Sequence, residues 1–268
     1  TTVSASTFTL TAARAFIDAT KNLKGAVNIG LSEPLNAVKV EFTPTALIVT
    51  GTHFDLGLTI RVPGHSTERA VTLLPYKAML KVIPKMFDPA GPLEISLSAD
   101  KTYVTFAQGP RTWEIGTVQH YDAEADFPAV VEPDNAETLV ATFRRMRNLY
   151  TAHQFVNHAL AKEDNRPILT GALVKFGGDR ALLVAADGYR LSLAEFEHLT
   201  HAEVEVIIPG KGLAWAMSVL DPNRPLTVRY SKAKKTLLLV QEGIVASFCE
   251  IEGRFPNYES IIPRDLPY

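Results

Sequence analysis

The sequence repeats itself at half its length, and this repeat strongly constrains how the chain can fold. In a chain of 268 residues, positions 35–86 align with positions 169–220 at a constant offset of 134. The register pairs residues of the same kind: Leu35 with Leu169, Val40 with Val174, Phe42 with Phe176, Pro75 with Pro209 and Lys77 with Lys211. Self-similarity of this kind indicates two copies of one structural unit.

The composition is that of an ordinary globular protein, with 46% hydrophobic and 21% charged residues. The length suffices for two independent cores. The single cysteine, Cys249, excludes an intrachain disulfide and favours a reducing compartment. No apolar run has the length of a membrane span, and the first residues lack the pattern of a signal peptide. We therefore expect a cytoplasmic protein without membrane contacts.

The apolar periodicity has the same order in both halves: a helix, alternating strands, a second helix and further strands. Helical spacing covers 11–24, 75–87, 137–150 and 209–220. Strand alternation covers 38–42, a second strand that runs through 47–49 and on past Gly51, and then 93–97, 104–106 and 113–115. The polar stretch 131–135, which contains a proline, marks the boundary between the halves. We predict two α+β domains, residues 1–134 and 135–268, each with helices over one face of antiparallel sheet.

Charge is distributed unevenly between the expected helices and the rest of the chain. The four helical ranges contain ten basic and two acidic residues, which leaves 17 basic and 27 acidic residues elsewhere. Lys77, Lys81 and Lys85 recur every four residues, so they lie on one face of the second helix. A solvated lysine face would explain one such helix. Four basic helices in one chain favour binding to a polyanion, although the formal net charge is only -2.

Several motifs resemble a known family. The second half contains Arg166–Gly171, Ala185–Leu191 and Glu252–Tyr258. In this order and spacing they resemble the second domain of the bacterial beta sliding clamp of DNA polymerase III. The first half resembles the first domain of that family through Leu73–Lys77 and Asp126–Pro128. The resemblance covers essentially the whole chain.

The resemblance implies a fold and a set of DNA contacts. Sliding clamps are rings of six similar domains, with helices lining a central hole and sheets forming the outer wall. Such a ring holds duplex DNA through phosphate charge and needs no contact with base edges. The resemblance and the charge distribution together give these DNA-binding candidates: Lys21, Lys24, Lys77, Lys81, Lys85, Arg144, Arg145, His153, Gln154 and Lys211.

The resemblance also implies a pocket for short peptides of polymerases and of the clamp loader. The matching positions are Leu169, Ala186, Gly188, Tyr189, Arg190, Leu191, Pro256 and Ile261. A hydrophobic groove edged by one arginine suits a docked peptide. The alternative is that the leucines and the isoleucine are simply core residues.

Two features depart from the family pattern. The family has three domains, and this sequence stops where the third would begin, although that domain supplies the rest of the pocket. Three two-domain chains could close a six-domain ring head to tail; alternatively, the chain is a fragment or a clamp relative that never closes and regulates replication proteins. The second departure is the stretch 155–165, which is longer than the corresponding turn of the family.

The sequence gives no support for an enzyme. Pro209–Gly212 lacks the spacing of a phosphate-binding loop, and there is no Gly-x-Ser-x-Gly motif for a serine nucleophile. His198 and His201, near Glu195 and Glu197, could ligate a metal in principle, but an exposed polar loop explains them more simply. We expect a non-catalytic protein with no cofactor and no metal.

Overall fold

The computed structural model describes residues 6–27, 35–53, 55–133, 137–162, 166–178 and 180–262. Contacts divide the chain into two compact units. The first is Thr1–Glu132 with Gly243–Ala246, and the second is Pro133–Glu242 with Ser247–Tyr268. The boundary expected between residues 134 and 135 lies outside the described residues. In the described part of the chain, no helix is long and apolar enough to cross a membrane.

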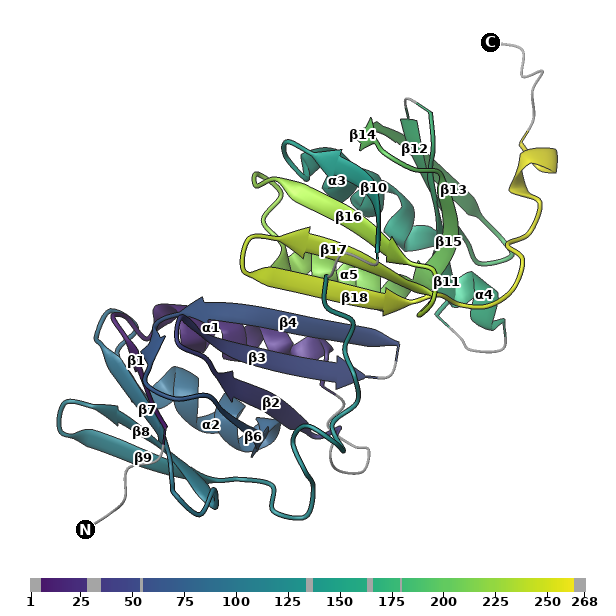
Figure 1. Ribbon diagram of the computed structural model, residues 1–268. Coiled ribbons are helices and arrows are strands. Elements are labelled where there is room, and N and C mark those ends of the chain that lie inside the picture. The colour runs from purple at the N-terminus through teal and green to yellow at the C-terminus, as the bar shows by residue number, and fades with distance from the viewer. Residues whose placement is uncertain are drawn as a thin grey trace. The chain divides into compact units, whose positions relative to one another are not determined.

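The first unit is built from two antiparallel sheets and two main helices (Figure 1). Its elements are β1 (Thr7–Leu10), α1 (Arg14–Asn22), η1 (Leu23–Gly25), β2 (Ala37–Phe42), β3 (Ala46–His53), β4 (Leu56–Pro63), β5 (His65–Ser66), β6 (Ala70–Pro75), α2 (Tyr76–Met86), β7 (Leu93–Leu97), β8 (Tyr103–Gln108) and β9 (Arg111–Gly116). Within the unit the strand orders are β5-β1-β7-β8-β9 and β4-β3-β2-β6.

The second unit repeats this arrangement. Its elements are β10 (Thr138–Phe143), α3 (Arg147–Val156), η2 (Asn157–Ala159), α4 (Pro167–Thr170), β11 (Gly171–Phe176), β12 (Arg180–Ala186), β13 (Leu191–Glu197), β14 (Leu199–Thr200), β15 (Val204–Pro209), α5 (Gly210–Val219), β16 (Leu226–Ser231), β17 (Thr236–Gln241), β18 (Ile244–Cys249) and η3 (Tyr258–Ser260). The strand orders are β14-β10-β16-β17-β18 and β13-β12-β11-β15. The sequence repeat is therefore a structural repeat: β2 and β11, like α2 and α5, begin 134 residues apart.

The structure corrects one predicted helix and adds strands that periodicity alone misses. The range 137–150 is not one helix: Thr138–Phe143 is strand β10, paired antiparallel with β16, and α3 begins only at Arg147. The residues of β10 are mostly β-branched or aromatic, which favours a strand, and its burial pattern is half-buried. The strands β1, β4 and β6 and their counterparts β10, β13 and β15 were not predicted.

In each unit, one position between the two helices is filled in a different way. In the first unit, Tyr76 at the start of α2 is fully buried, and its hydroxyl donates a 3.0 Å hydrogen bond to the backbone oxygen of Thr20 in α1. The register places Gly210 at the equivalent point of α5. A Cβ atom added there would lie 2.7 Å from both terminal methyl groups of Leu160. The leucine methyl groups therefore lie close to where a side chain at position 210 would begin.

The segment that follows the last strand of each unit turns back to an edge strand. In the first unit the backbone N–H of Val118 donates to the oxygen of Leu73 in β6, at 2.9 Å. In the second unit the N–H of Ile251 donates to the oxygen of Ile207 in β15, at 2.8 Å. The repeat thus extends to the connections between elements and is not confined to the strands and helices.

The buried hydroxyl of Tyr76 gives a test of the packing between α1 and α2. Replacing Tyr76 by phenylalanine keeps the ring but leaves the backbone oxygen of Thr20 without its donor in a buried place. We expect the free energy of unfolding to fall by about 1–2 kcal/mol, measured by urea denaturation. The matched control is Tyr103→Phe, at a half-buried tyrosine of β8, for which we expect a change within about 0.5 kcal/mol.

Candidate functional site

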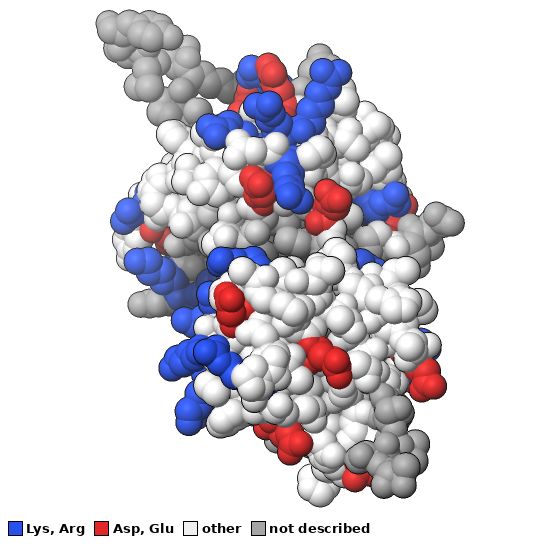
Figure 2. All heavy atoms as spheres, turned by 90° about the vertical axis from the view of Figure 1, so that its left-hand side faces the viewer, with Lys and Arg blue, Asp and Glu red and all other residues white. Residues whose placement is uncertain are grey.

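The basic side chains predicted to bind DNA are exposed and concentrated on the helices and beside them. The helices α1, α2, α3 and α5 together carry seven basic residues and one acidic residue. The exposed candidates are Lys21, Lys24, Lys77, Lys81, Lys85, Arg144, Arg145, Gln154 and Lys211. In Figure 2 the basic side chains of the first unit gather along one edge, while acidic side chains are scattered over the rest of its visible face.

These cations differ from the other cations of the chain in how they are neutralised. All nine ion pairs within the described residues use a cation from a strand, turn or loop. Arg61 pairs with Glu132 at 3.0 Å, for example, and Arg180 pairs with Glu195 at 2.8 Å. None of the basic DNA-binding candidates on or beside the helices forms an ion pair with a described residue. Seven cations outside the helices thus have ion-pair partners among the described residues, while none of these side chains has one.

His153 is the exception among the ten candidates, and the structure corrects its assignment. Its side chain is buried, with only 6% of its surface exposed. Burial lowers the pKa of His153, and a hydrogen bond with Asn157 opposes that shift. Because it is turned into the unit, His153 is not available to a phosphate at the surface. The sequence alone does not reveal this burial, because it depends on how the helix packs within the unit.

The second unit contains a cleft of about 580 Å³ at the place where the peptide pocket was predicted. It is lined by His158, Leu160, Ala161, Lys162, Arg166, Leu169, Asp187, Gly188, Tyr189 and Arg190. Four of the eight predicted pocket residues are in this lining: Leu169, Gly188, Tyr189 and Arg190. The other four are not in the lining.

Those four residues divide into two kinds. Ala186 and Leu191 pack against a buried cluster that contains Leu169, Leu173, Val184, Ile207, Phe255 and Tyr258. Pro256 and Ile261 are exposed, Ile261 with 66% of its surface. Leu169 belongs both to this buried cluster, with only 5% of its surface exposed, and to the lining of the cleft. Leu169 is therefore a core residue that also faces the cleft, and its peptide-binding role stays a prediction.

One wall of the cleft is a rigid turn at Asp187–Arg190. The carboxylate of Asp187 accepts hydrogen bonds from the backbone N–H groups of Tyr189 and Arg190, both at 3.0 Å, and pairs with the Arg190 guanidinium at 3.1 Å. These bonds to the ionised form lower the pKa of Asp187. Gly188 has a φ of +90°, and Tyr189 at the tip is 97% exposed. The turn holds an aromatic ring in solvent beside a fixed arginine.

Further residues of the lining come from the stretch 155–165, and this contribution was not predicted. His158, Leu160, Ala161 and Lys162 belong to it, and Arg166 follows it. Residues 163–165 lie outside the described residues. The one available signal was the extra length itself, which gives no indication of where the segment packs.

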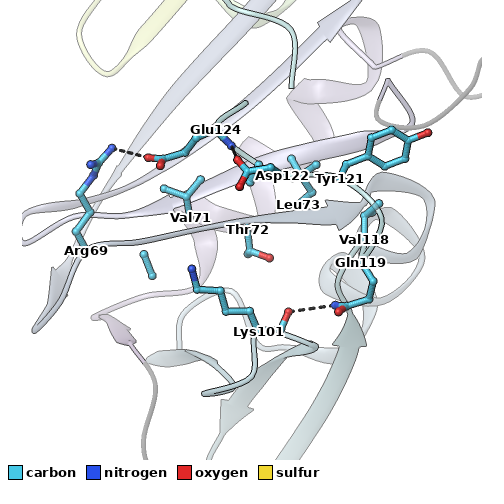
Figure 3. Close-up of a pocket in the computed structure, with 12 residues that line it drawn as sticks. Arg69, Val71, Thr72, Leu73, Lys101, Val118, Gln119, Tyr121, Asp122 and Glu124 are labelled. Atoms are coloured by element: carbon cyan, nitrogen blue, oxygen red, sulfur yellow. Dashed lines mark hydrogen bonds and ion pairs between the residues drawn. The ribbon is translucent and has the colours of Figure 1, made fainter. Parts of the chain in front are cut away.

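The first unit has a groove of about 490 Å³ beside the edge strand β6 (Figure 3). Arg69 pairs with Glu124 at 3.1 Å at one end, and the Gln119 amide donates to the backbone oxygen of Lys101 at 3.2 Å at the other. The Asp122 carboxylate caps the N–H groups of Glu124 and Ala125 at 2.7 and 2.8 Å. Most polar groups of this groove thus bond to one another. This pattern is typical of a loop held in place by its own side chains.

The histidines near the end of β13 contact hydroxyl groups. The ring of His198 stacks with Phe143, and its Nε2 atom lies 2.7 Å from the Thr200 hydroxyl. His201 Nε2 lies 3.1 Å from the Thr142 hydroxyl. Among the described residues there is no group of three His, Cys, Asp or Glu side chains that could hold a metal ion.

Comparisons with known proteins agree with this geometry. Residues 145–257 match the family model described as DNA polymerase III beta subunit, central domain. The beta sliding clamp of Haemophilus influenzae is 25% identical over 239 residues, covering 86% of this chain and 61% of the relative. That of Bacillus subtilis is 22% identical over 240 residues, with the same two coverages of 86% and 61%. The chain thus spans about three fifths of the length of the curated relatives it matches.

Solved structures show the same fold. The DNA polymerase sliding clamp of Bacillus subtilis superposes with a TM-score of 0.85 at 19% identity, covering 98% of this chain and 69% of that chain. The DNA polymerase III beta subunit of Thermotoga maritima gives a TM-score of 0.83 at 20% identity, covering 97% and 68%. The two-unit α+β architecture is therefore the sliding-clamp fold.

The positive φ of Gly188 gives a test of the turn. Replacing Gly188 by alanine forces a side chain into a backbone conformation that L residues rarely adopt, with the new Cβ 3.0 Å from the Arg166 guanidinium. We expect the free energy of unfolding to fall by about 1–2 kcal/mol, measured by chemical denaturation. Gly177→Ala is the control, because its φ is ordinary and its Cβ would meet only the flexible Glu203 side chain at 3.4 Å. Equal effects of the two substitutions would contradict the strain argument.

Proposed function

Since this chain is a relative of the bacterial beta sliding clamps, we propose that it acts as a DNA sliding clamp. It holds duplex DNA without sequence preference and tethers a DNA polymerase as a processivity factor. It has no catalytic role of its own, and it works in the cytoplasm, where a bacterial chromosome is replicated. Its partners are double-stranded DNA, peptides of a polymerase and of a clamp loader, and further copies of itself.

The observation that carries this proposal is the set of helix cations without internal ion partners. A row such as Lys77, Lys81 and Lys85 repels itself by a few tenths of a kcal/mol per pair, and each of the three is exposed. Duplex DNA supplies phosphate charges that relieve this repulsion and releases its own counterions on binding. Contacts limited to phosphates carry no sequence information, which suits a protein that must slide.

Self-association is supported by the edge strand β9. Residues 111–114 of β9 are exposed, and Trp113 has 42% of its surface in solvent. Open edges of this kind pair readily with a strand of another chain. Three copies of a two-unit chain joined head to tail would contain the six domains of a clamp ring. A clamp relative that does not close, and instead binds replication proteins as a regulator, is the alternative.

The mass of the protein in solution separates these two forms. We expect multi-angle light scattering to give three times the chain mass of 29.4 kDa. Trp113→Lys places a charge on the exposed edge and should yield the monomer mass. A wild-type monomer at micromolar concentration would contradict ring closure by this chain alone and would favour the regulator.

The charge argument gives a test of DNA binding. Replacing Lys77, Lys81 and Lys85 together by alanine should weaken binding to linear duplex DNA and lower the slope of log K against log salt by up to about three phosphate equivalents. Fluorescence anisotropy over a salt series measures both quantities.

The control removes the same number of charges elsewhere. Arg180, Lys232 and Lys234 are exposed cations outside the helices, and their joint replacement by alanine should leave the salt slope unchanged. If both triple variants lose equal affinity, DNA binding depends on total charge and not on a helical surface.

A further inference from the structure

The helices α2 and α5 are equivalent elements of the repeat, but they present different side chains to the surface. The offset of 134 residues carries the lysine row of α2 onto three positions of α5: Lys211, Trp215 and Val219. We propose that Trp215 is a DNA-contact residue that holds the sugar-phosphate backbone by apolar packing and by its indole N–H, without charge. This inference rests on the proposed DNA binding and adds to it a contact that neutralises no phosphate.

The two helices bury the same positions, so their surface positions are equivalent too. Met79, Val82 and Ile83 are buried in α2. The residues 134 positions later are buried in α5: Leu213, Ala216 and Met217. Position 215 therefore lies on the side of α5 that corresponds to the lysine side of α2. In the second unit this side has lost two of its three charges.

Trp215 is half-buried, and no described residue accepts a hydrogen bond from its indole N–H. In the described part of the chain, only His153 and His198 have buried side-chain nitrogen or oxygen atoms without a partner. The indole nitrogen therefore reaches the surface. A tryptophan with an apolar ring and a free donor suits a boundary between apolar and polar groups. The backbone of duplex DNA is such a boundary, because deoxyribose carbons alternate with phosphate oxygens.

The residues around Trp215 on α5 are compatible with a nucleic-acid backbone. Lys211 precedes Trp215 by four residues, so the two side chains are neighbours on the helix surface. The helix contains no acidic residue that would repel a phosphate. Lys211 is exposed and has no ion pair with a described residue. A duplex whose phosphate binds Lys211 has its sugars within reach of the indole.

Three single substitutions test this inference by fluorescence anisotropy of a labelled linear duplex over a salt series: Trp215→Ala, Trp215→Lys and Thr138→Lys. The last of these is the matched control for one added charge. Thr138 is an exposed residue of strand β10 in the same unit, outside the helices. All variants are measured in the full chain.

We expect Trp215→Ala to weaken duplex binding about fivefold at every salt concentration. The slope of log K against log salt should stay unchanged, because an apolar contact releases no counterion. Trp215→Lys should raise that slope by about one phosphate equivalent, since it restores a lysine of the row seen in α2. Thr138→Lys should leave the slope unchanged. A gain in slope cannot result from partial unfolding.

The intrinsic fluorescence gives a second readout, because the chain contains only two tryptophans, Trp113 and Trp215. Unlabelled duplex should change the tryptophan emission of the wild-type chain. It should leave the emission of Trp215→Phe unchanged, since only Trp113 emits in that variant. An equal change in both proteins would assign the signal to Trp113 and contradict the contact at Trp215.

Two further outcomes overturn the inference and leave the proposed function intact. If Trp215→Ala binds duplex as tightly as the wild-type chain, or if the two added lysines raise the slope equally, α5 makes no DNA contact at this position. The joint replacement of Lys77, Lys81 and Lys85 tests the proposed function separately. Wild-type affinity and slope in that triple variant would contradict DNA binding by the helices, and this inference would fall with it.

Discussion

The start of the second main helix packs differently in the two units, and this difference separates two otherwise similar folds. In the first unit the ring of Tyr76 is buried and ties α2 to α1 through Thr20. In the second unit Gly210 has no side chain, and Leu160 from a neighbouring segment lies close to it. Because close packing tolerates few voids, a change at one residue is coupled to the path of a whole segment. That segment lines part of the cleft.

The charged side chains of the helices also differ from those of the strands and turns in the partners that they have. The apolar faces of the helices point into the units. Among the described residues no lysine or arginine of these helices forms an ion pair, although Arg147 donates a 3.2 Å hydrogen bond to the side-chain oxygen of Asn223. The strands and turns carry both signs side by side and neutralise themselves, as Arg69 does with Glu41 and Glu124 at 3.1 Å each. Exposed pairs of this kind contribute little to stability, but they neutralise the cations that form them. The contrast concentrates positive potential on the helices without a large net charge on the chain.

The sequence predicted the repeat and three of the four helices because these depend on local spacing and on comparison of the chain with itself. The prediction of one helix over 137–150 was wrong because Leu139, Phe143, Met146 and Tyr150 are spaced three or four residues apart, as in a helix. In the structure the first two belong to strand β10 and the last to α3. His153 and Leu160 could not be placed, since their burial depends on contacts with residues far away in the sequence. The sequence motif that contains Asp187–Arg190 indicated the family, but the turn that these residues form was not predicted.

The backbone bonds from Val118 to Leu73 and from Ile251 to Ile207 affect how the protein behaves at high concentration. A sheet edge with free N–H and C=O groups can template the addition of strands from other molecules and so lead to aggregates. In both units the returning segment occupies part of the edge at β6 or β15, while β9 stays exposed in the first unit. The fold thereby makes strand addition at β6 and β15 less favourable than at the exposed edge of β9.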